Sequence, residues 1–366
     1  MSERLPANRG AVMLPLRHHG RRPGNHVTSS MLEETHQAPA RVAELLREDV
    51  AAYGALADRL AAQPPAFAAT VARGSSDHAA TYAASLLGLA CGLVTASIPP
   101  SLITRYGAAL ALERALVLAI SQSGASPDIV ATLRAATAAR GCTVAIVNAP
   151  GAPLAEAARH VLPQHAGPER SVAATKSFIC SLTCVARLIA IWRRDVALSA
   201  ALERLPERLE AALGCDWSAA VPLLAPAQSL YVVGRGLGFG IVHEWALKLK
   251  ETSGLHAEAL SAAEVHHGPR AVIEKGFPVV ALGLDDPAGR DAAAFAAELA
   301  ANGHTVAVAS AAPIAGHHLP LPPPLHPLLD PIVAVQAFYP LAAALAAARG
   351  LDPDQPRGLS KVTTTL

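Results

Sequence analysis

Four side chains able to transfer protons lie close together in the sequence. Lys248 and Glu251 are three residues apart, so a helix would present both on one face, and Glu244 lies one turn before Lys248 on that face. His267 precedes a Gly-Pro dipeptide, so its imidazole is expected at the end of an element, where a substrate can reach it. Such groups are typical of proton-transfer sites. The same Glu and Lys spacing also fits a solvated helix, stabilised by roughly 0.2–0.5 kcal/mol per pair.

A metal site is the second interpretation of this stretch, because His266 and His267 are adjacent. The zinc-protease pattern requires a second histidine four residues after the first, but His243-Glu244 is followed at that position by Leu247. No other spacing of His, Cys and carboxylates matches a closed metal site. We therefore expect neither a metal nor another cofactor.

Serine-rich segments follow two predicted strands. Residues 67–72 are strand-like and end at R-G-S-S-D, and the buried strand 115–120 ends at S-Q-S-G-A-S-P-D. Ser126 is expected to cap a helix that begins with Pro127, so that hydroxyls and free helix amides together form an anion site. The alternative is that the serines only cap the helix and fill turns. No G-x-x-x-x-G-K-[ST] occurs, which disfavours a nucleoside triphosphate. The candidate anion-binding serines are Ser75, Ser76, Ser121, Ser123 and Ser126.

The elements that must position these residues repeat along the chain. Strands alternate with helices, which predicts an α/β protein with parallel sheets covered on both faces. Near residue 228 the pattern begins again: S-L-Y-V-V-G-R-G echoes A-A-T-V-A-R-G-S-S, and G-H-T-V-A-V-A-S echoes G-C-T-V-A-I-V-N. Two tandem domains are predicted, residues 35–213 and 214–350, followed by a tail, 351–366. The second copy lacks the serines, so one phosphate site per chain is expected.

Composition restricts the partners. The 366 residues are 52% hydrophobic and 16% charged, with a formal net charge of +1, which indicates a core-rich globular protein. Since Lys and Arg form no excess or stripe, nucleic acid is not expected as a partner. The five cysteines are odd in number and contain no C-x-x-C, so we expect no disulfide framework and a cytoplasmic protein.

The ends of the chain and one long apolar run need separate interpretation. Residues 1–34 carry Arg, His, Pro and Gly without periodicity at first and are expected to be largely a disordered extension. Met31 is a candidate translation start, a hypothesis that the intact mass of native protein would test. No secretory signal is expected. Residues 331–348 are uncharged but contain Gln336 and Pro340, which predicts a buried helix and no membrane partner.

The segments R-G-S-S-D, S-Q-S-G-A-S-P-D, V-A-A-T-K, K-L-K-E, E-V-H-H-G-P and D-Q-P-R-G-L-S-K-V-T resemble the sugar isomerase (SIS) domains of the glucosamine-6-phosphate synthase family. The resemblance runs from about residue 35 to the C-terminus and implies a flavodoxin-like three-layer fold for each domain. It implies that the sugar phosphate is held by Ser75, Ser76, Ser121, Gln122, Ser123 and Ser126. It also implies that Val172 and Ala173 line the sugar, while Ala174 replaces a family serine and puts the substrate choice in question.

The resemblance also implies catalytic roles. His267 would shuttle the proton that opens the sugar ring and would be contributed across a homodimer interface. Glu251 would move a proton between carbons 2 and 1, with Lys248 holding it ionised or stabilising charge. Lys361 would enter the active site with the C-terminal tail, although general considerations favour a frayed surface charge at that position.

The synthase family carries an N-terminal glutaminase domain whose nucleophile is its first cysteine. Here the first cysteine is Cys91, so glutamine is not the expected nitrogen source. The resemblance then extends to isomerising glucosamine-6-phosphate deaminases, hydrolases that release ammonia and fructose 6-phosphate. The alternatives are an isomerase or deglycase for another phosphorylated amino sugar or Amadori product, and a sugar-phosphate sensor without catalysis.

Overall fold

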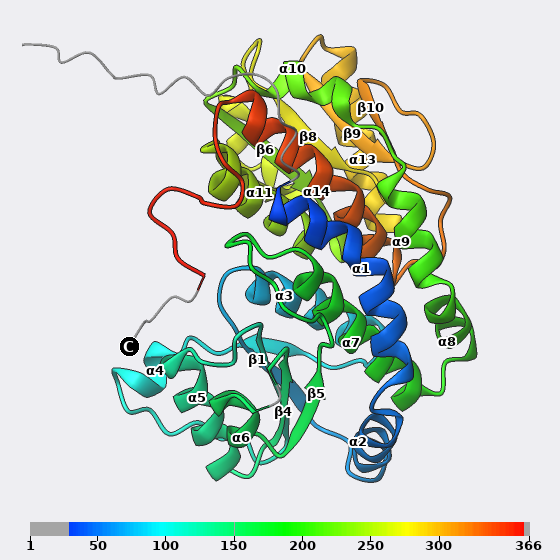
Figure 1. Ribbon diagram of the computed structural model, residues 1–366. Coiled ribbons are helices and arrows are strands. Elements are labelled where there is room, and N and C mark those ends of the chain that lie inside the picture. Colours follow the sequence, from blue (N-terminus) through cyan, green and yellow to red (C-terminus); the bar gives the residue numbers. More distant parts are fainter. Residues whose placement is uncertain (1–28, 150, 362–366) are drawn as a thin grey trace, which may run out of the picture.

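The computed structural model describes residues 29–149 and 151–361 (Figure 1). The described chain forms two parallel five-stranded sheets, as the sequence predicts. The first sheet has the order β2-β1-β3-β4-β5, and the second has the equivalent order β7-β6-β8-β9-β10. This order places a topological switch point between β1 and β3, where α/β proteins bind ligands beyond the carboxyl ends of the strands. The strands are Phe67–Val71 (β1), Thr95–Ser97 (β2), Ala115–Ser121 (β3), Cys142–Val147 (β4), His160–Pro163 (β5), Ser229–Gly234 (β6), His256–Ser261 (β7), Val279–Leu282 (β8), Val306–Ser310 (β9) and His317–Pro320 (β10).

The inner strands are continuous apolar runs because helices cover both faces of each sheet. Every residue of β3 and of β8 is buried. The sequence predicted these inner strands but missed the short outer ones, β2, β5 and β10, and it missed β7, whose residues are largely exposed or half-buried. Outer strands cover less core and so carry weaker apolar patterns.

Six helices fill the space between the two sheets and give the two repeats one shared core (Figure 1). They are Ser30–Arg47 (α1), Ser75–Cys91 (α3), Lys176–Arg193 (α7), Leu205–Leu213 (α9), Phe239–Ser253 (α11) and Asp330–Ala348 (α14). The remaining helices are Val50–Ala62 (α2), Ser101–Thr104 (α4), Pro127–Ala138 (α5), Pro153–Ala157 (α6), Val196–Glu203 (α8), Val221–Leu224 (α10), Ala262–Val265 (α12) and Pro287–Ala301 (α13), with short 3-10 turns at Ser218–Ala220, Gly236–Gly238 and Pro269–Val272. Separate smaller clusters fill the outer face of each sheet.

Helix α1 begins earlier than the predicted boundary at residue 35. Ser29 caps it by accepting a hydrogen bond from the Leu32 amide, and Asp354 of the tail accepts 2.7 Å hydrogen bonds from the amides of Ser30 and Met31. A carboxylate is favourable here because it faces the positive end of the helix dipole. Residues 30–34 are therefore helical rather than disordered, while the disorder predicted for residues 1–28 falls outside the described residues.

Helix α14 is long and apolar enough to cross a membrane, but 78% of its most apolar window is buried inside the protein. This confirms the predicted buried helix. Its polar residue Gln336 has a structural partner: the side-chain amide donates a 3.0 Å hydrogen bond to the Thr35 carbonyl. That carbonyl lacks its usual helical donor because the residue four positions later is Pro39, which has no N–H. The glutamine thus satisfies a gap that proline leaves in α1.

The turn from β3 to α5 requires a glycine. Gly124 has a φ of 63°, and a Cβ at this position would lie 2.6 Å from Ala152 Cβ and 2.7 Å from Val147 Cγ2. The Gly124 amide also donates a 3.1 Å hydrogen bond to Ser121 Oγ. The turn is therefore packed tightly against β4 and α6, and this packing fixes the serines on either side of it.

We predict that Gly124→Ala lowers the free energy of unfolding by about 2–5 kcal/mol, because it combines a strained backbone with overpacking. Gly54→Ala is the matched control, since Gly54 lies inside α2 with no atom within 4 Å of an added Cβ. It should stabilise the protein by about 0.5–1 kcal/mol. Urea unfolding followed by circular dichroism measures both, and a tolerated Gly124→Ala would contradict the tight turn.

Candidate active site

A buried lysine joins the two repeats. Lys248 Nζ, on α11, lies 2.6 Å from Glu251 Oε2 and 3.3 Å from Glu244 Oε1 of the same helix. It also donates a 3.1 Å hydrogen bond to Ser75 Oγ at the start of α3. We call these four residues the lysine cluster. Three oxygens thus surround one ammonium, and one of them belongs to the serine-rich segment of the first repeat. The predicted base and the predicted anion site therefore meet at one place.

The charges within the lysine cluster indicate what each member can do. Burial lowers the pKa of Lys248, but the carboxylates of Glu244 and Glu251 raise it more strongly, so the net pKa lies above its usual range. The ammonium therefore stays protonated and acts as a fixed charge rather than as a base. The side chain of Glu244 is 0% exposed and that of Glu251 is 18% exposed. Glu251 is thus the carboxylate that a substrate can reach.

One oxygen of Glu251 is held and the other is open. Oε2 accepts the hydrogen bond from Lys248, whereas Oε1 has no hydrogen-bond partner in the part of the chain that the structure describes. A carboxylate oriented through one oxygen is suited to take a proton with the other. This geometry favours proton transfer over the alternative of a solvated helix surface, because the ion pair is buried.

The two serine-rich segments lie side by side at the switch point. Strands β1 and β3 pair in parallel with Val71 opposite Ala119, so their carboxyl ends reach the same edge. Arg73 of the first segment forms a 3.1 Å ion pair with Asp128 at the start of α5. The N-termini of α3 and α5 therefore converge, with Ser75 at the first position of α3. Two helix N-termini facing one point favour an anion.

The hydroxyls of this region differ in availability. Ser76, Gln122 and Ser126 are half-buried and make no side-chain hydrogen bond within residues 29–149 and 151–361. Ser121 and Ser123 instead accept hydrogen bonds from amides of their own turn. Ser126 occupies the predicted N-cap position before Pro127, but the predicted capping bond is absent. The hydroxyl of Ser126 is therefore not used by the helix.

Glu169 anchors the loop that carries V-A-A-T-K. Its carboxylate is buried and accepts hydrogen bonds from the amides of Thr175 and Ser177 at 3.0 and 3.1 Å. Lys361 of the tail contributes a 3.1 Å ion pair with Glu169 and a 2.6 Å hydrogen bond to the Ser171 carbonyl. Burial raises the pKa of Glu169, but Lys361 and these hydrogen bonds lower it more, so the net pKa lies below its usual range. Lys361 is thus paired inside the protein rather than frayed at the surface.

The same loop leads into α7, which begins at Lys176. Glu34 of α1 accepts hydrogen bonds from the amides of Arg170 and Ser171, which fixes the first part of the loop. Ala173 is fully buried in the shared core, so its side chain cannot line a sugar as the resemblance implied, and only its backbone remains for that role.

Tyr339 of α14 is fully buried, and its hydroxyl has no hydrogen-bond partner among the described residues. Burial raises the pKa of its hydroxyl well above the usual value, and the charges of Glu244, Glu169 and Glu251 raise it further. The three carboxylates therefore act on this hydroxyl through their charges and keep it protonated.

His267 is not brought to this region within one chain. It is exposed in the turn after α12, at the carboxyl edge of the second sheet. Glu251 lies near the end of α11, just before β7 enters the same sheet from the opposite edge. The six residues of β7 span about 20 Å. Among the described contacts, none links His267 to the lysine cluster.

The second repeat carries a carboxylate where the first carries Ser126. Helix α13 corresponds to α5, and its N-cap Asp286 accepts 2.9 and 3.2 Å hydrogen bonds from the amides of Ala288 and Gly289. A carboxylate thus occupies the N-cap of α13, whereas the acidic residue in the first turn of α5, Asp128, forms an ion pair with Arg73. This observation agrees with the expectation of one phosphate site per chain.

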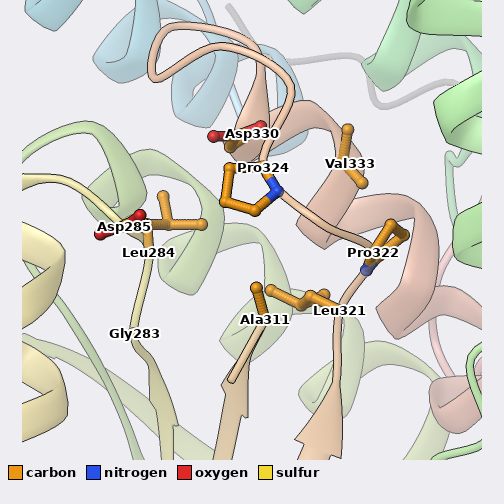
Figure 2. A pocket seen from close by; sticks show the side chains of 9 residues that line it. All are labelled: Gly283, Leu284, Asp285, Ala311, Leu321, Pro322, Pro324, Asp330 and Val333. Atoms are coloured by element: carbon orange, nitrogen blue, oxygen red, sulfur yellow. The ribbon is translucent and has the colours of Figure 1, made fainter.

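The pocket at the corresponding edge of the second sheet is also too small for a sugar. Figure 2 shows the pocket there, walled mainly by Leu284, Leu321 and two prolines, with Asp285 and Asp330 at one side. It encloses about 20 Å³. A water molecule needs roughly 10–15 Å³, whereas small-molecule sites usually have about 300–1,000 Å³. This pocket therefore holds water at most.

Sequence reasoning missed several residues of the site. His78 forms a 3.0 Å hydrogen bond with Glu244, and Arg73, Asp128, Glu34, Glu169 and Tyr339 position the loops and charges described above. The only available signal was the position of His78 one turn after Ser75 on the predicted helix. Within the described chain, no group of three His, Cys, Asp or Glu side chains lies close enough to hold a metal ion.

Comparison with known proteins reveals a match over most of the chain. The family model described as "SIS domain" matches residues 68–191 and 223–314. The isomerizing glutamine–fructose-6-phosphate aminotransferase of Methanothermobacter thermautotrophicus is 34% identical over 347 residues, which cover 91% of this chain and 57% of the relative. The chain thus spans about half the length of the curated relatives that it matches.

Solved structures agree in fold. A protein of Silicibacter pomeroyi DSS-3, provisionally described as a phosphosugar isomerase, is 42% identical with a TM-score of 0.84, covering 89% of this chain and 100% of that one. The glucosamine-6-phosphate deaminase of Thermotoga maritima has a TM-score of 0.74 at 21% identity, covering 92% of this chain and 100% of that one, which is a likeness of fold alone.

We predict that Lys248→Met lowers the free energy of unfolding by about 3–5 kcal/mol, because it leaves the buried Glu244 carboxylate without its cation. Lys250→Met is the matched control, since Lys250 is exposed on the same helix, and it should change stability by no more than about 0.5 kcal/mol. Urea unfolding measures both variants. Equal stability of the two variants would show that the ion pair is not buried.

Proposed function

The chain belongs to the SIS domain family, and we propose that it is a sugar-phosphate isomerase that deaminates glucosamine 6-phosphate to fructose 6-phosphate and ammonia. One observation carries the proposal: Lys248 binds both Glu251, a carboxylate with one open oxygen, and Ser75, the first residue of the serine-rich anion site. A phosphate held at the serines would fix one end of a sugar, and the base would then act on its other end. The relatives' names support the same substrate class.

The proposed reaction begins with anion binding. The phosphate is held by Ser75, Ser76, Ser121, Gln122, Ser123 and Ser126, together with the positive end of the α3 helix dipole. Ser75 accepts its hydrogen bond from Lys248, so its own hydroxyl proton remains free for a phosphate oxygen. Arg73 adds positive charge at the edge while paired with Asp128. The hydroxyls and the helix dipole thus orient the sugar before chemistry.

The chemical steps are proton transfers followed by hydrolysis. His267 moves the proton that opens the ring. Glu251 removes the proton from carbon 2 and returns it to carbon 1, which converts the amino aldehyde through an enolamine to a carbon-2 imine. Water then adds to the imine, and the carbon–nitrogen bond breaks. The balance is glucosamine 6-phosphate plus water giving fructose 6-phosphate plus ammonia, with no oxidant or reductant.

Lys248 and Lys361 supply charge in this scheme. Lys248 keeps Glu251 ionised and oriented and can offset charge that develops on the enolamine. Lys361, in the tail, contacts the loop that carries Val172 and Ala173. It donates hydrogen bonds to the Glu169 carboxylate and to the Ser171 carbonyl. We infer that it closes the sugar site with the tail.

A second candidate keeps the same machinery and changes the sugar. Ala174 stands where the resembling synthases have a serine, so one polar contact to the sugar is missing. An aldehyde–ketone shift on another phosphorylated amino sugar or an Amadori product needs the same base. A non-catalytic sensor is the third candidate, but it gives no reason for the ion pair that holds Glu251.

We predict that Glu251→Gln lowers turnover of glucosamine 6-phosphate by about 10²- to 10⁴-fold, the usual effect of losing a positioned base. Ammonia and fructose 6-phosphate are quantified together, without glutamine, and should appear in equal amounts. Glu203→Gln, which removes an exposed carboxylate on α8, is the matched control and should retain wild-type turnover.

Undiminished turnover in Glu251→Gln would overturn the assignment of the base. If the wild-type protein forms neither product while the sugar phosphate still raises its melting temperature, the deaminase proposal fails. The other amino sugars are then tested in the same assay, and a thermal shift without any turnover identifies the sensor.

We further propose that the active unit is a homodimer in which His267 of one chain serves the lysine cluster of the other. The opposite placement of His267 and Glu251 about the second sheet supports this proposal. In a symmetric dimer each chain would contribute its His267 to the site of the other, so the dimer would contain two equivalent sites.

We predict complementation between two inactive variants. Chains carrying Glu251→Gln and chains carrying His267→Ala are given different affinity tags and co-expressed, and the mixed dimer is purified through both tags. It should regain about half of the wild-type turnover, because one of its two sites contains both intact groups. If both groups were needed within one chain, the mixed dimer would stay inactive.

A further inference from the structure

His78 contacts the lysine cluster from the first repeat. It lies on α3, one turn after Ser75, and its Nδ1 is 3.0 Å from Glu244 Oε2. The other oxygen of Glu244 is 3.3 Å from Lys248 Nζ. Glu244 is fully buried, and it therefore stands between one imidazole and one ammonium.

A glycine creates this contact. Gly240 lies on α11 one turn before Glu244, and an added Cβ there would be 2.7 Å from the His78 carbonyl and 3.0 Å from the Tyr82 amide. The two helices therefore approach backbone to backbone. The close approach brings the side chains of His78 and Glu244 within hydrogen-bond distance.

The charge on His78 changes the balance of the whole cluster. With a neutral imidazole, the charge of Glu244 acts fully on Lys248, and the cluster of two carboxylates and one ammonium has an excess negative charge. With a protonated imidazole, Glu244 is shared between two cations. Lys248 is then neutralised mainly by Glu251, which is held more tightly and becomes a weaker base.

We propose that His78 is a positioning residue that acts through Glu244 and Lys248 to set the basicity of Glu251, and hence the pH range in which the enzyme works. The electrostatic effect passes from the imidazole of His78 to the carboxylate of Glu244, then to the ammonium of Lys248 and finally to Glu251. We call this series of contacts the relay, and it spans both repeats. Only its consequence for catalysis rests on the proposed function. The electrostatic link between His78 and Glu251 does not depend on which sugar is the substrate.

A second imidazole and two charged side chains lie near His78. His243 of α11 has its ring centroid 5.6 Å from that of His78. Burial, and then the charges of His78 and Lys250, lower the pKa of His243 to about 4, so it stays neutral at higher pH. Asp77 on the same helix and Arg73 just before it are the other charged groups nearby.

The first test is independent of turnover. The titration of the His78 ring is followed by NMR in protein with ¹³C-labelled histidine, and its signal is assigned by its loss in His78→Asn. Glu251→Gln removes one negative charge from the cluster, so protonation of His78 becomes less favourable. The midpoint should fall by about 1 pH unit. Glu203→Gln, the exposed control, should leave it unchanged.

The second test is the pH profile of kcat. Asparagine retains an N–H donor for Glu244 but cannot gain a charge, so His78→Asn should keep most of the plateau turnover and shift the acidic limb to lower pH. Any decrease of kcat at low pH that remains in His78→Asn is assigned to other groups, such as His267. In His78→Ala the Glu244 oxygen loses its donor, and turnover should fall at every pH.

An unchanged His78 midpoint in Glu251→Gln would overturn the proposal, whichever substrate is used. Equal loss of kcat in His78→Asn and His78→Ala without a shifted limb would also overturn it, since that result describes a purely structural residue. If glucosamine 6-phosphate is not turned over, the NMR titration alone decides, so failure of the relay remains distinct from failure of the proposed function.

Discussion

The structure depends on one buried ammonium group. Lys248 comes from the second repeat, and its hydrogen bond to Ser75 reaches the first. A lysine in this position is costly to remove from water, and two carboxylates offset that cost only when all the partners are in place. Docking of the repeats therefore completes the surroundings of Lys248 by adding Ser75 to the two carboxylates of its own helix. The contact lies beside the core that the two repeats share between their sheets.

The two repeats have the same strand order but different chemistry. In the first, the helix after the third strand starts with Ser126, whose hydroxyl makes no hydrogen bond within the described part of the chain. In the second, Asp286 caps the equivalent helix with a carboxylate. The two helix starts therefore differ in the group at the N-cap, a hydroxyl in one repeat and a carboxylate in the other. The second repeat contributes instead the helix that carries Lys248 and Glu251, so the copies have become complementary rather than redundant.

Much of the fold was predictable from local patterns, because buried strands and serine-rich turns leave clear signals in the sequence. The shared face of Glu244, Lys248 and Glu251 followed from helical spacing alone. The contact of Lys248 with Ser75 did not, because 173 positions separate the two residues and only tertiary packing brings them together. His78 was overlooked for the same reason.

Local rules also failed where a distant residue intervened. Glu34 of α1 binds two amides of the loop before α7, and Ser126 lacks its capping bond although its N-cap position is correct. A single lysine near the end of a chain is usually frayed, and Lys361 departs from that expectation through Glu169. Such effects depend on partners that spacing cannot reveal.

The attachment of the tail at Asp354 has a consequence for Lys361. Asp354 is bound to the start of α1, so residues 355–360 act as a short tether between two anchored ends. Because the tether is short, Lys361 meets Glu169 at an effective local concentration of about the millimolar range. A weak individual contact between Lys361 and Glu169 can then persist. The attachment at Asp354 therefore keeps Lys361 near Glu169 whenever the ion pair itself opens.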